Sequence, residues 1–185
     1  MQSTGADAAP VAVLASAPGL PDYLRPGLRL VFVGFNPSLR SAALGHYYAG
    51  RGNLFWPLLY ESGLLPEPLS YAEDHRVLEF GIGLTDIVKR PTRASAELAA
   101  TEAQAGVAAV SARLRQVAPR VVCCNGKGVY AWFRSGPVTP GPQTELLGSA
   151  RVFVVPSTSA RNGHWSRAAK LLAFQTLRDY VDALP

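Results

Sequence analysis

The sequence LRLVFVGFNPS, residues 28–38, decides the fold class of this chain. Its apolar run from Leu28 to Phe35 predicts a short strand that is buried on both faces, and Asn36-Pro37 ends that strand in a loop. Three further short apolar runs predict buried strands of the same kind, at residues 80–84, 121–124 and 152–155.

Helical segments separate these strands. Four helices are predicted: residues 53–62, a long helix capped by Ser95 and ended by Pro119, residues 126–133, and residues 166–184. Residues 85–92 are predicted to form a loop, because Pro91 follows two basic residues. Strands that alternate with helices in this way indicate an α/β fold, a three-layer α/β/α sandwich around a mainly parallel central sheet.

Length and composition favour one domain. The chain has 185 residues, of which 48% are hydrophobic, so it can bury one sizeable core and is short for two. Its alanine-rich start contains Asp7, Pro10 and Pro18 and lacks the basic segment of a signal peptide. We therefore expect a flexible tail over residues 1–20, a single domain over residues 21–185, no membrane span and a cytoplasmic location.

The charge of the chain fits a polyanionic partner. The formal net charge is +5, and most of the cationic residues are arginines, many of them in Gly-, Pro- and Ser-rich stretches. Loop arginines suit phosphate contacts, because one guanidinium can bind two phosphate oxygens. A genome rich in G and C would also favour arginine codons, so composition alone leaves both interpretations open.

The two cysteines exclude several kinds of site. Cys123 and Cys124 are adjacent in a predicted strand, so their side chains point to opposite faces and a disulfide between them is not expected. Two thiols cannot supply an iron-sulfur cluster or a closed zinc site, and no histidine spacing suggests a metal. We expect neither a metal nor a cofactor.

Two loops follow strand ends, where parallel sheets bind their ligands. The first contains VFVGFNPS (31–38), GHYY (45–48) and GNLFW (52–56), and the second contains VPSTSARN (155–162). Together with GIGLTDIV (81–88) and NGK (125–127), and in this order, they resemble the mismatch-specific uracil-DNA and thymine-DNA glycosylase family of the uracil-DNA glycosylase superfamily. The resemblance runs from about residue 30 to residue 180, and the second loop is closer to the thymine-DNA branch.

The resemblance implies a monofunctional DNA glycosylase. Such an enzyme would hydrolyse the N-glycosidic bond of uracil, with thymine as a second candidate base, in mispaired or single-stranded DNA and leave an abasic site. No lysine matches the buried Schiff-base lysine of glycosylases that also cut the backbone. We expect DNA as the partner, a cytoplasmic, nucleoid-associated location, no cofactor and a monomer.

The two candidate catalytic residues are Asn36 and Asp86. Asn36 would hold the attacking water, because an amide can hydrogen-bond water but cannot usefully accept its proton; alternatively, it only caps the turn before Pro37. Asp86 is a departure, because the thymine-DNA branch has an asparagine there and the bacterial branch a lysine. An ionised Asp86 would activate water as a general base; alternatively, it pairs with Lys89, Arg90 or Arg93 and only orders the loop.

Five residues are candidates for binding the extruded base. Tyr48 is the first choice for stacking on it, with Tyr47 beside it, and the backbone N–H groups of the turn that begins at Phe35 would receive a uracil oxygen. Ser41 matches a position that contacts base or sugar in the bacterial branch, and Asn53 would face the pocket. The residues that follow Asn53, Phe55 and Trp56, are assigned to the core.

Arg161 is the candidate for insertion into the DNA stack. It has the place of the family's wedge arginine, and a side chain that fills the hole is needed because base extrusion costs a few kcal/mol. The other candidate DNA contacts are Ser157, Ser159, Ala160, Lys127 and Arg93, with Arg51, Arg90 and Arg167 as lesser candidates for phosphate contacts.

Two other function classes stay open from the sequence. A non-catalytic nucleic-acid-binding domain of the same fold would bind mismatched DNA without releasing a base. A nucleotide-binding enzyme is suggested by Gly126-Lys127-Gly128 after a strand, although this is not the phosphate-binding Gly-x-x-x-x-Gly-Lys-Ser/Thr pattern.

Overall fold

The computed structural model describes residues 19–184. The flexible tail predicted over residues 1–20 lies outside the described residues, apart from Gly19 and Leu20. Leu20 is only 4% exposed and belongs to the core, so packed structure begins before residue 21. Within residues 19–184, no helix is long and apolar enough to cross a membrane.

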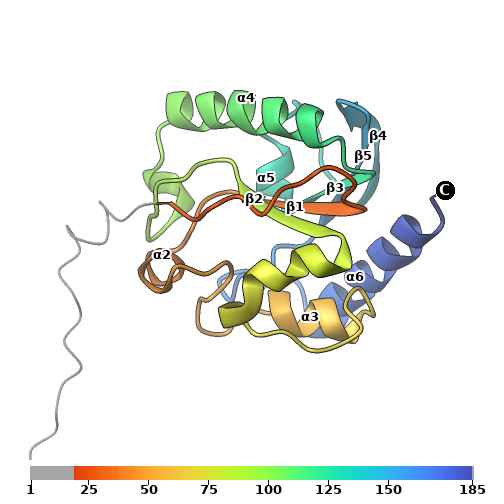
Figure 1. The fold of residues 1–185 in the computed structure, drawn as a ribbon. Helices are drawn as coiled ribbons and strands as arrows, with labels where there is room; N and C mark the ends of the chain where they lie inside the picture. The colour runs from red at the N-terminus through yellow and green to blue at the C-terminus, as the bar shows by residue number, and fades with distance from the viewer. Residues whose placement is uncertain (1–18, 185) are drawn as a thin grey trace, which may run out of the picture.

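A five-stranded sheet forms the centre of the molecule (Figure 1). In spatial order its strands are β2 (Ile82–Asp86), β1 (Leu30–Gly34), β3 (Val121–Asn125), β5 (Ala150–Val155) and β4 (Gly141–Leu147). The first four are parallel and β4 is antiparallel, which confirms the predicted α/β fold with a mainly parallel sheet. Their carboxyl ends therefore meet at one edge, which is where the site is built.

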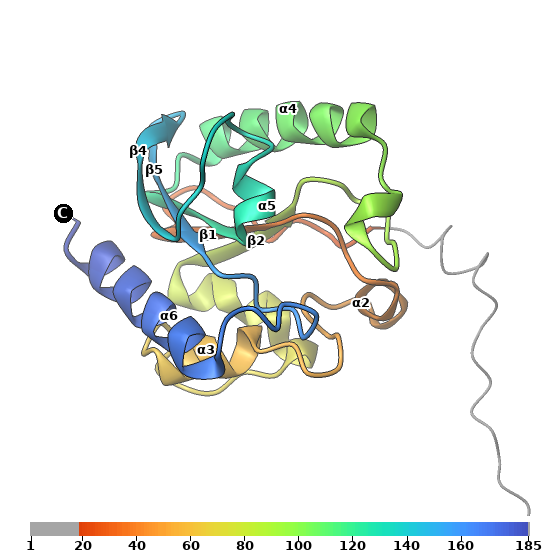
Figure 2. The ribbon, with the colours of Figure 1, turned by 180° about the vertical axis from the view of Figure 1, so that it is seen from behind.

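Helices cover both faces of the sheet. They are α2 (Leu39–Leu44), α3 (Phe55–Glu61), η1 (Tyr71–Phe80), η2 (Ser95–Glu97), α4 (Ala100–Val117), α5 (Lys127–Tyr130) and α6 (Arg167–Asp182). Figures 1 and 2 show α4 and α5 on one face and α3, α6 and η1 on the other, so the predicted three layers are present.

Successive side chains of each strand point to opposite faces of the sheet, so the strands contribute to two hydrophobic cores, one on each face. Phe32 and Cys123 face α3 and α6, whereas Val33 and Cys124 face α4 and α5. The two cysteines are thus on opposite faces, as predicted, and both are free and buried. Phe55 and Trp56, assigned to the core from the sequence, are 0% and 5% exposed.

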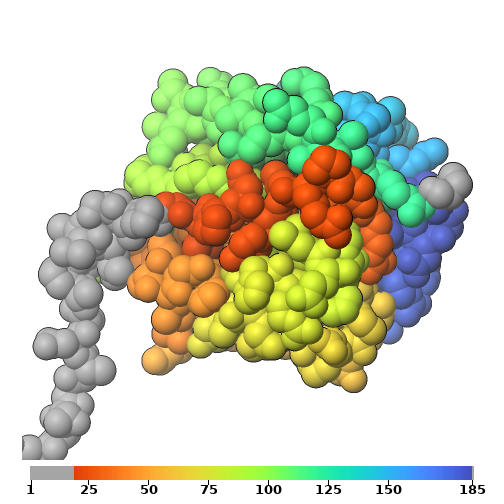
Figure 3. All heavy atoms as spheres, viewed as in Figure 1, coloured from red at the N-terminus to blue at the C-terminus, as the bar shows by residue number. Residues whose placement is uncertain are grey.

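The segment before β1 covers the β2 edge of the sheet. The backbone of Tyr23 exchanges two hydrogen bonds with that of Leu84, at 2.9 and 3.1 Å. Figure 3 shows this N-terminal segment, in red, on the surface between α4 and η1. The segment that contains Tyr23 therefore partly covers the outer edge of β2.

Several predicted boundaries were wrong. Strand β2 continues through Thr85 and Asp86, which were predicted to lie in a loop, because both are buried and pair with β1. Ser95 does not cap the long helix; it begins the separate turn η2, and α4 starts after Ala99. Helix α5 is shorter than predicted and ends at Tyr130, and three elements, α2, η1 and β4, were not predicted.

Candidate functional site

A pocket of about 590 Å³ opens at the carboxyl ends of the parallel strands. It brings together most of the residues singled out from the sequence: Phe35, Asn36, Ser41, Tyr47, Tyr48, Asn53, Asp86, Arg93, Ser157, Ser159 and Arg161. Lys127 and Ala160 do not line it; Lys127 is exposed at the start of α5, and Ala160 is exposed in the loop between Ser159 and Arg161. Segments far apart in the chain thus converge on one cavity.

Asp86 lies deep in this pocket and has no protein partner. The residue is 3% exposed, and its side chain makes no hydrogen bond or ion pair with residues 19–184. Burial raises the pKa of its carboxyl group to about 7, with the nearby charge of Lys89 opposing the shift. A buried carboxyl group that titrates near neutral pH in a cavity is typical of a catalytic acid or base.

The expected alternative, in which Asp86 pairs with a basic neighbour, is wrong. Lys89 binds Asp22 at 2.5 Å, and Arg90 binds Glu102 at 2.9 Å. The carboxylate of Asp86 is therefore left facing the pocket.

Asn36 is held by its amide nitrogen. Nδ2 donates to the carbonyl oxygen of Arg90 at 2.9 Å and to Oγ1 of Thr92 at 2.8 Å. Both amide hydrogens are used, and the side-chain oxygen accepts no hydrogen bond from the described residues. The free group that Asn36 offers to the pocket is an acceptor, which suits a water molecule.

Tyr47 and Tyr48 form one wall of the pocket. Both hydroxyl groups are buried without a hydrogen-bond partner among the described residues. The ring of Tyr48 stacks on Phe55 with centroids 3.8 Å apart, and its backbone has a positive φ of 54°. Burial and the charge of Asp86 raise the pKa of both phenols, so they stay protonated and can donate hydrogen bonds.

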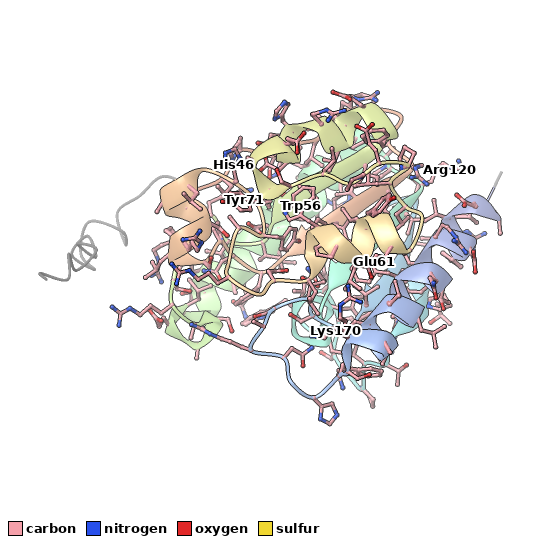
Figure 4. All side chains as sticks on the ribbon, turned by 90° about the horizontal axis from the view of Figure 1, so that it is seen from below. His46, Trp56, Glu61, Tyr71, Arg120 and Lys170 are labelled. Atoms are coloured by element: carbon pink, nitrogen blue, oxygen red, sulfur yellow. The ribbon has the colours of Figure 1, made fainter. Side chains whose placement is uncertain are left out.

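Asp74, which the sequence analysis missed, orders this wall. It is fully buried on η1, and its Oδ2 accepts the backbone N–H of Tyr47 at 2.8 Å. Its Oδ1 is 3.1 Å from Nδ1 of His46 and accepts the hydroxyl of Tyr23 at 3.0 Å. His46 thus contacts a neighbouring element; Figure 4 shows it beside Tyr71.

Ser41 and Asn53 line the pocket but use their side chains to shape its loops. Ser41 Oγ accepts the backbone N–H of Ala49 at 3.2 Å and the hydroxyl of Ser38 at 3.0 Å. Asn53 Oδ1 accepts the backbone N–H of Phe55 at 3.0 Å. Their contribution in this structure is to loop geometry.

Three further pocket residues were not selected from the sequence. Trp132 stacks on Phe35 with centroids 5.9 Å apart and an interplanar angle of 16°. Asn125 and Thr158 are both buried and exchange hydrogen bonds. Asn125 had a usable signal, because it directly follows a predicted buried strand, as Asn36 does.

The rim of the pocket carries uncompensated positive charge. Four basic residues near it are exposed and form no ion pair with residues 19–184: Arg51, Arg93, Lys127 and Arg161. The Arg161 guanidinium donates to the carbonyl oxygen of Arg93, which holds the two loops together. Arg90 and Arg167, in contrast, are paired with Glu102 and Glu61.

No group of three or more metal-ligating side chains occurs in the described part of the chain. The pocket instead combines a partly ionised carboxyl group, an amide oxygen, two phenol donors and a cationic rim. Such a set can activate water, donate hydrogen bonds to a leaving group and hold a polyanion.

Comparisons with known proteins concern the family and the fold of the chain. The model of the uracil DNA glycosylase superfamily matches residues 21–182. A solution NMR structure of a proposed uracil DNA glycosylase from Methanosarcina acetivorans has the same fold, with a TM-score of 0.63 and 21% identity. That match covers 90% of this chain and 98% of the archaeal one.

Proposed function

Because this chain belongs to the uracil DNA glycosylase superfamily, we propose that it is a monofunctional DNA glycosylase that removes uracil from mispaired or single-stranded DNA. The observation that carries the proposal is the unpaired, buried carboxyl group of Asp86, which faces a pocket bordered by a cationic rim. The products would be the free base and an abasic site.

Asp86 is the proposed general base. Its ionised form takes a proton from water, the water oxygen bonds to C1′ of the deoxyribose, and the bond from C1′ to the base breaks with its electron pair on the base. The pKa near 7 leaves about half of the carboxyl groups ionised at neutral pH. A base of this strength supports a faster reaction than an amide that only positions water.

Asn36 positions that water. Its nitrogen is fixed by Arg90 and Thr92, so the oxygen is presented in one orientation without further loss of freedom. Asn36 and Asp86 extend from adjacent strand ends, because Gly34 and Asp86 are paired residues of β1 and β2.

Tyr47, Tyr48 and the Phe35 turn are proposed to hold the base. The two unpaired hydroxyl groups gain partners when a base with carbonyl and N–H groups enters, which converts an unfavourable burial into a binding contribution. The Phe35 and Trp132 rings offer a flat apolar surface for the base.

The exposed Arg161 is proposed to enter the DNA stack when the base leaves it, and the rim arginines to bind phosphates. Thymine is a second candidate base. The resemblance of Ser-Thr-Ser-Ala-Arg (157–161) to the thymine-DNA branch favours it. A monomer is sufficient, since every proposed group comes from one chain.

The test is cleavage of labelled oligonucleotides that carry a G:U, A:U or G:T pair, or uracil in a single strand, followed by alkali. Wild type is compared with Asp86→Asn and Asn36→Ala, and with Gly163→Ala, which changes an open position, as control. We expect uracil release by wild type and by the control, with the largest loss in Asp86→Asn.

Two outcomes would change the proposal. A larger loss in Asn36→Ala than in Asp86→Asn would transfer the main role to water positioning by the amide. Binding of mismatched duplex without release of any base would support the second candidate function, a non-catalytic DNA-binding domain, which the cationic rim alone would also permit.

A further inference from the structure

The loop that carries Arg161 is tied to the end of β3 by a reciprocal pair of hydrogen bonds. Asn125 Nδ2 donates to Oγ1 of Thr158 at 3.0 Å, and the backbone N–H of Thr158 donates to Oδ1 of Asn125 at 3.0 Å. Both residues are buried, Thr158 completely. The carbonyl oxygen of Thr158 also accepts the N–H of Leu54 at 3.0 Å, which ties the loop to the start of α3.

A second tether comes from α6. Lys170 is 3% exposed, and its Nζ donates to the carbonyl oxygen of Asn162 at 2.9 Å. Asn162 Nδ2 in turn donates to the carbonyl oxygen of Ser157 at 3.0 Å, which closes the loop on itself. Figure 4 places Lys170 on the amino-terminal part of α6, beside this loop.

Burial of the Lys170 ammonium group is energetically unfavourable at this position. Lys170 has no carboxylate partner among residues 19–184, and burial lowers its pKa. Burying an ammonium group is unfavourable, so its use to hold one backbone carbonyl indicates that the position of this loop is important.

The residues between the tethers differ from the anchors. Thr158 and Lys170 are buried, whereas Ala160 and Arg161 are exposed at the tip. A loop fixed at both ends with an exposed tip does not have to be ordered when its ligand arrives, which reduces the entropic cost of binding.

We propose that the Asn125–Thr158 pair and the Lys170–Asn162 hydrogen bond form a clamp that preorganises residues 157–162 for insertion of Arg161 into duplex DNA. The inference rests on the proposed function, and it assigns Thr158 and Lys170 as positioning residues. Since a single strand has no paired stack to fill, the clamp acts on duplex substrates and is dispensable for single strands.

The experiment compares Thr158→Val, which keeps the shape but removes the acceptor, with Thr158→Ser, which keeps the hydroxyl. Amide hydrogen exchange of residues 157–162 is measured in the free protein. The rate of single-turnover cleavage is measured on a G:U duplex and on the same uracil-containing strand alone. We expect exchange about tenfold faster in Thr158→Val. Its duplex rate should fall roughly tenfold, its single-strand rate should stay within about twofold, and Thr158→Ser should restore both measurements.

Lys170→Met tests the clamp independently, because it removes the other tether, the hydrogen bond from Lys170 to Asn162. It retains the apolar stem and removes the ammonium group, and we expect the same selective loss on duplex. In a double variant with Arg161→Ala, either clamp substitution should add little, because the inserted side chain is already absent.

Equal losses on duplex and single strand would overturn the inference, since they would assign Thr158 to the base pocket. Unchanged loop exchange in both clamp variants would overturn it as well. If wild type releases no base from any substrate, the proposed function fails. The clamp proposal is then tested separately, by amide hydrogen exchange of the loop and by the affinity of the protein for a duplex that contains a tetrahydrofuran abasic analogue. There Thr158→Val should weaken binding as much as Arg161→Ala does.

Discussion

Gly34 and Asp86 lie so close together at the ends of β1 and β2 that a Cβ atom at position 34 would stand 2.2 Å from Oδ1 of Asp86. Real Cβ contacts do not reach this distance, so a side chain at position 34 and the carboxyl group cannot both keep their places. Position 34 therefore requires glycine because there is no room for a Cβ atom. Backbone conformation does not require it, since the φ of Gly34 is not in the left-handed region.

Gly34→Ala should displace the carboxyl group of Asp86 and lower uracil release by on the order of 100-fold, with a stability loss of about 1–3 kcal/mol from overpacking. Single-turnover cleavage and urea unfolding measure the two effects. Gly163→Ala is the matched control, because nothing lies within 4 Å of the added carbon. A Gly34→Ala variant with wild-type rate would refute the proposed use of Asp86.

The rate of base release should depend on pH through Asp86. Only the ionised carboxylate accepts a proton, so the single-turnover rate should rise with pH through about 7 and then level off, following the raised pKa of Asp86. Asp86→Asn should be slow and nearly flat over the same range. A wild-type profile that is flat from pH 5 to pH 9 would contradict general-base catalysis.

The same group should make the fold less stable as pH rises. The folded-state pKa of Asp86 is above its ordinary value of 3.8, so the folded protein binds the proton more tightly than the unfolded chain does. This contribution to stability is fully present below about pH 4 and is lost as pH rises through about 7, by up to about 4 kcal/mol. Relative to wild type, Asp86→Asn should gain stability from pH 5 to pH 8 in urea unfolding; a constant difference would contradict the raised pKa.

Tyr47→Phe should separate binding from stability. The variant removes a buried hydroxyl group that has no partner in the free protein, so the free energy of unfolding should stay level or rise by about 1 kcal/mol. In the proposed complex that hydroxyl binds the base, and KM should therefore rise several-fold while the fold is intact. Unchanged kinetics would remove Tyr47 from the base-binding set.

The elements that could be predicted from the sequence are those that bury a continuous apolar surface. The run 121–124 became β3, and Ser166 caps α6 through its hydrogen bond to the N–H of Ala169 at 3.1 Å. The elements that were missed lack this signal. Strand β4 is an edge strand with mostly exposed side chains, and η1 is a 3₁₀ helix that is rich in charged residues.

The candidate site was predictable where its residues lie at or just after the carboxyl end of a strand. Asn36 follows β1, Asp86 is the last residue of β2, and the structure brings both to one pocket. Asp74 was not predictable, because it is 27 residues from Tyr47 and only the packing of η1 brings the two together. The tether between Asn125 and Thr158 spans 33 residues and depends in the same way on the order of strands in the sheet.

The exposed basic rim predicts how DNA affinity responds to salt. Arg93 lines the pocket and forms no ion pair within residues 19–184, so its charge is available to a phosphate. If it makes one such contact, Arg93→Ala should reduce the slope of log K against log salt by about 0.9 in magnitude. Arg151→Ala is the control, because Arg151 is also exposed but lies at the amino end of β5, away from the pocket. Fluorescence anisotropy on an abasic-analogue duplex between 50 and 200 mM salt gives both slopes. Equal slopes for Arg93→Ala and wild type would exclude a phosphate contact at Arg93 and leave this residue only as the backbone partner of Arg161. A reduced slope for Arg151→Ala would instead place the DNA at the opposite edge of the sheet.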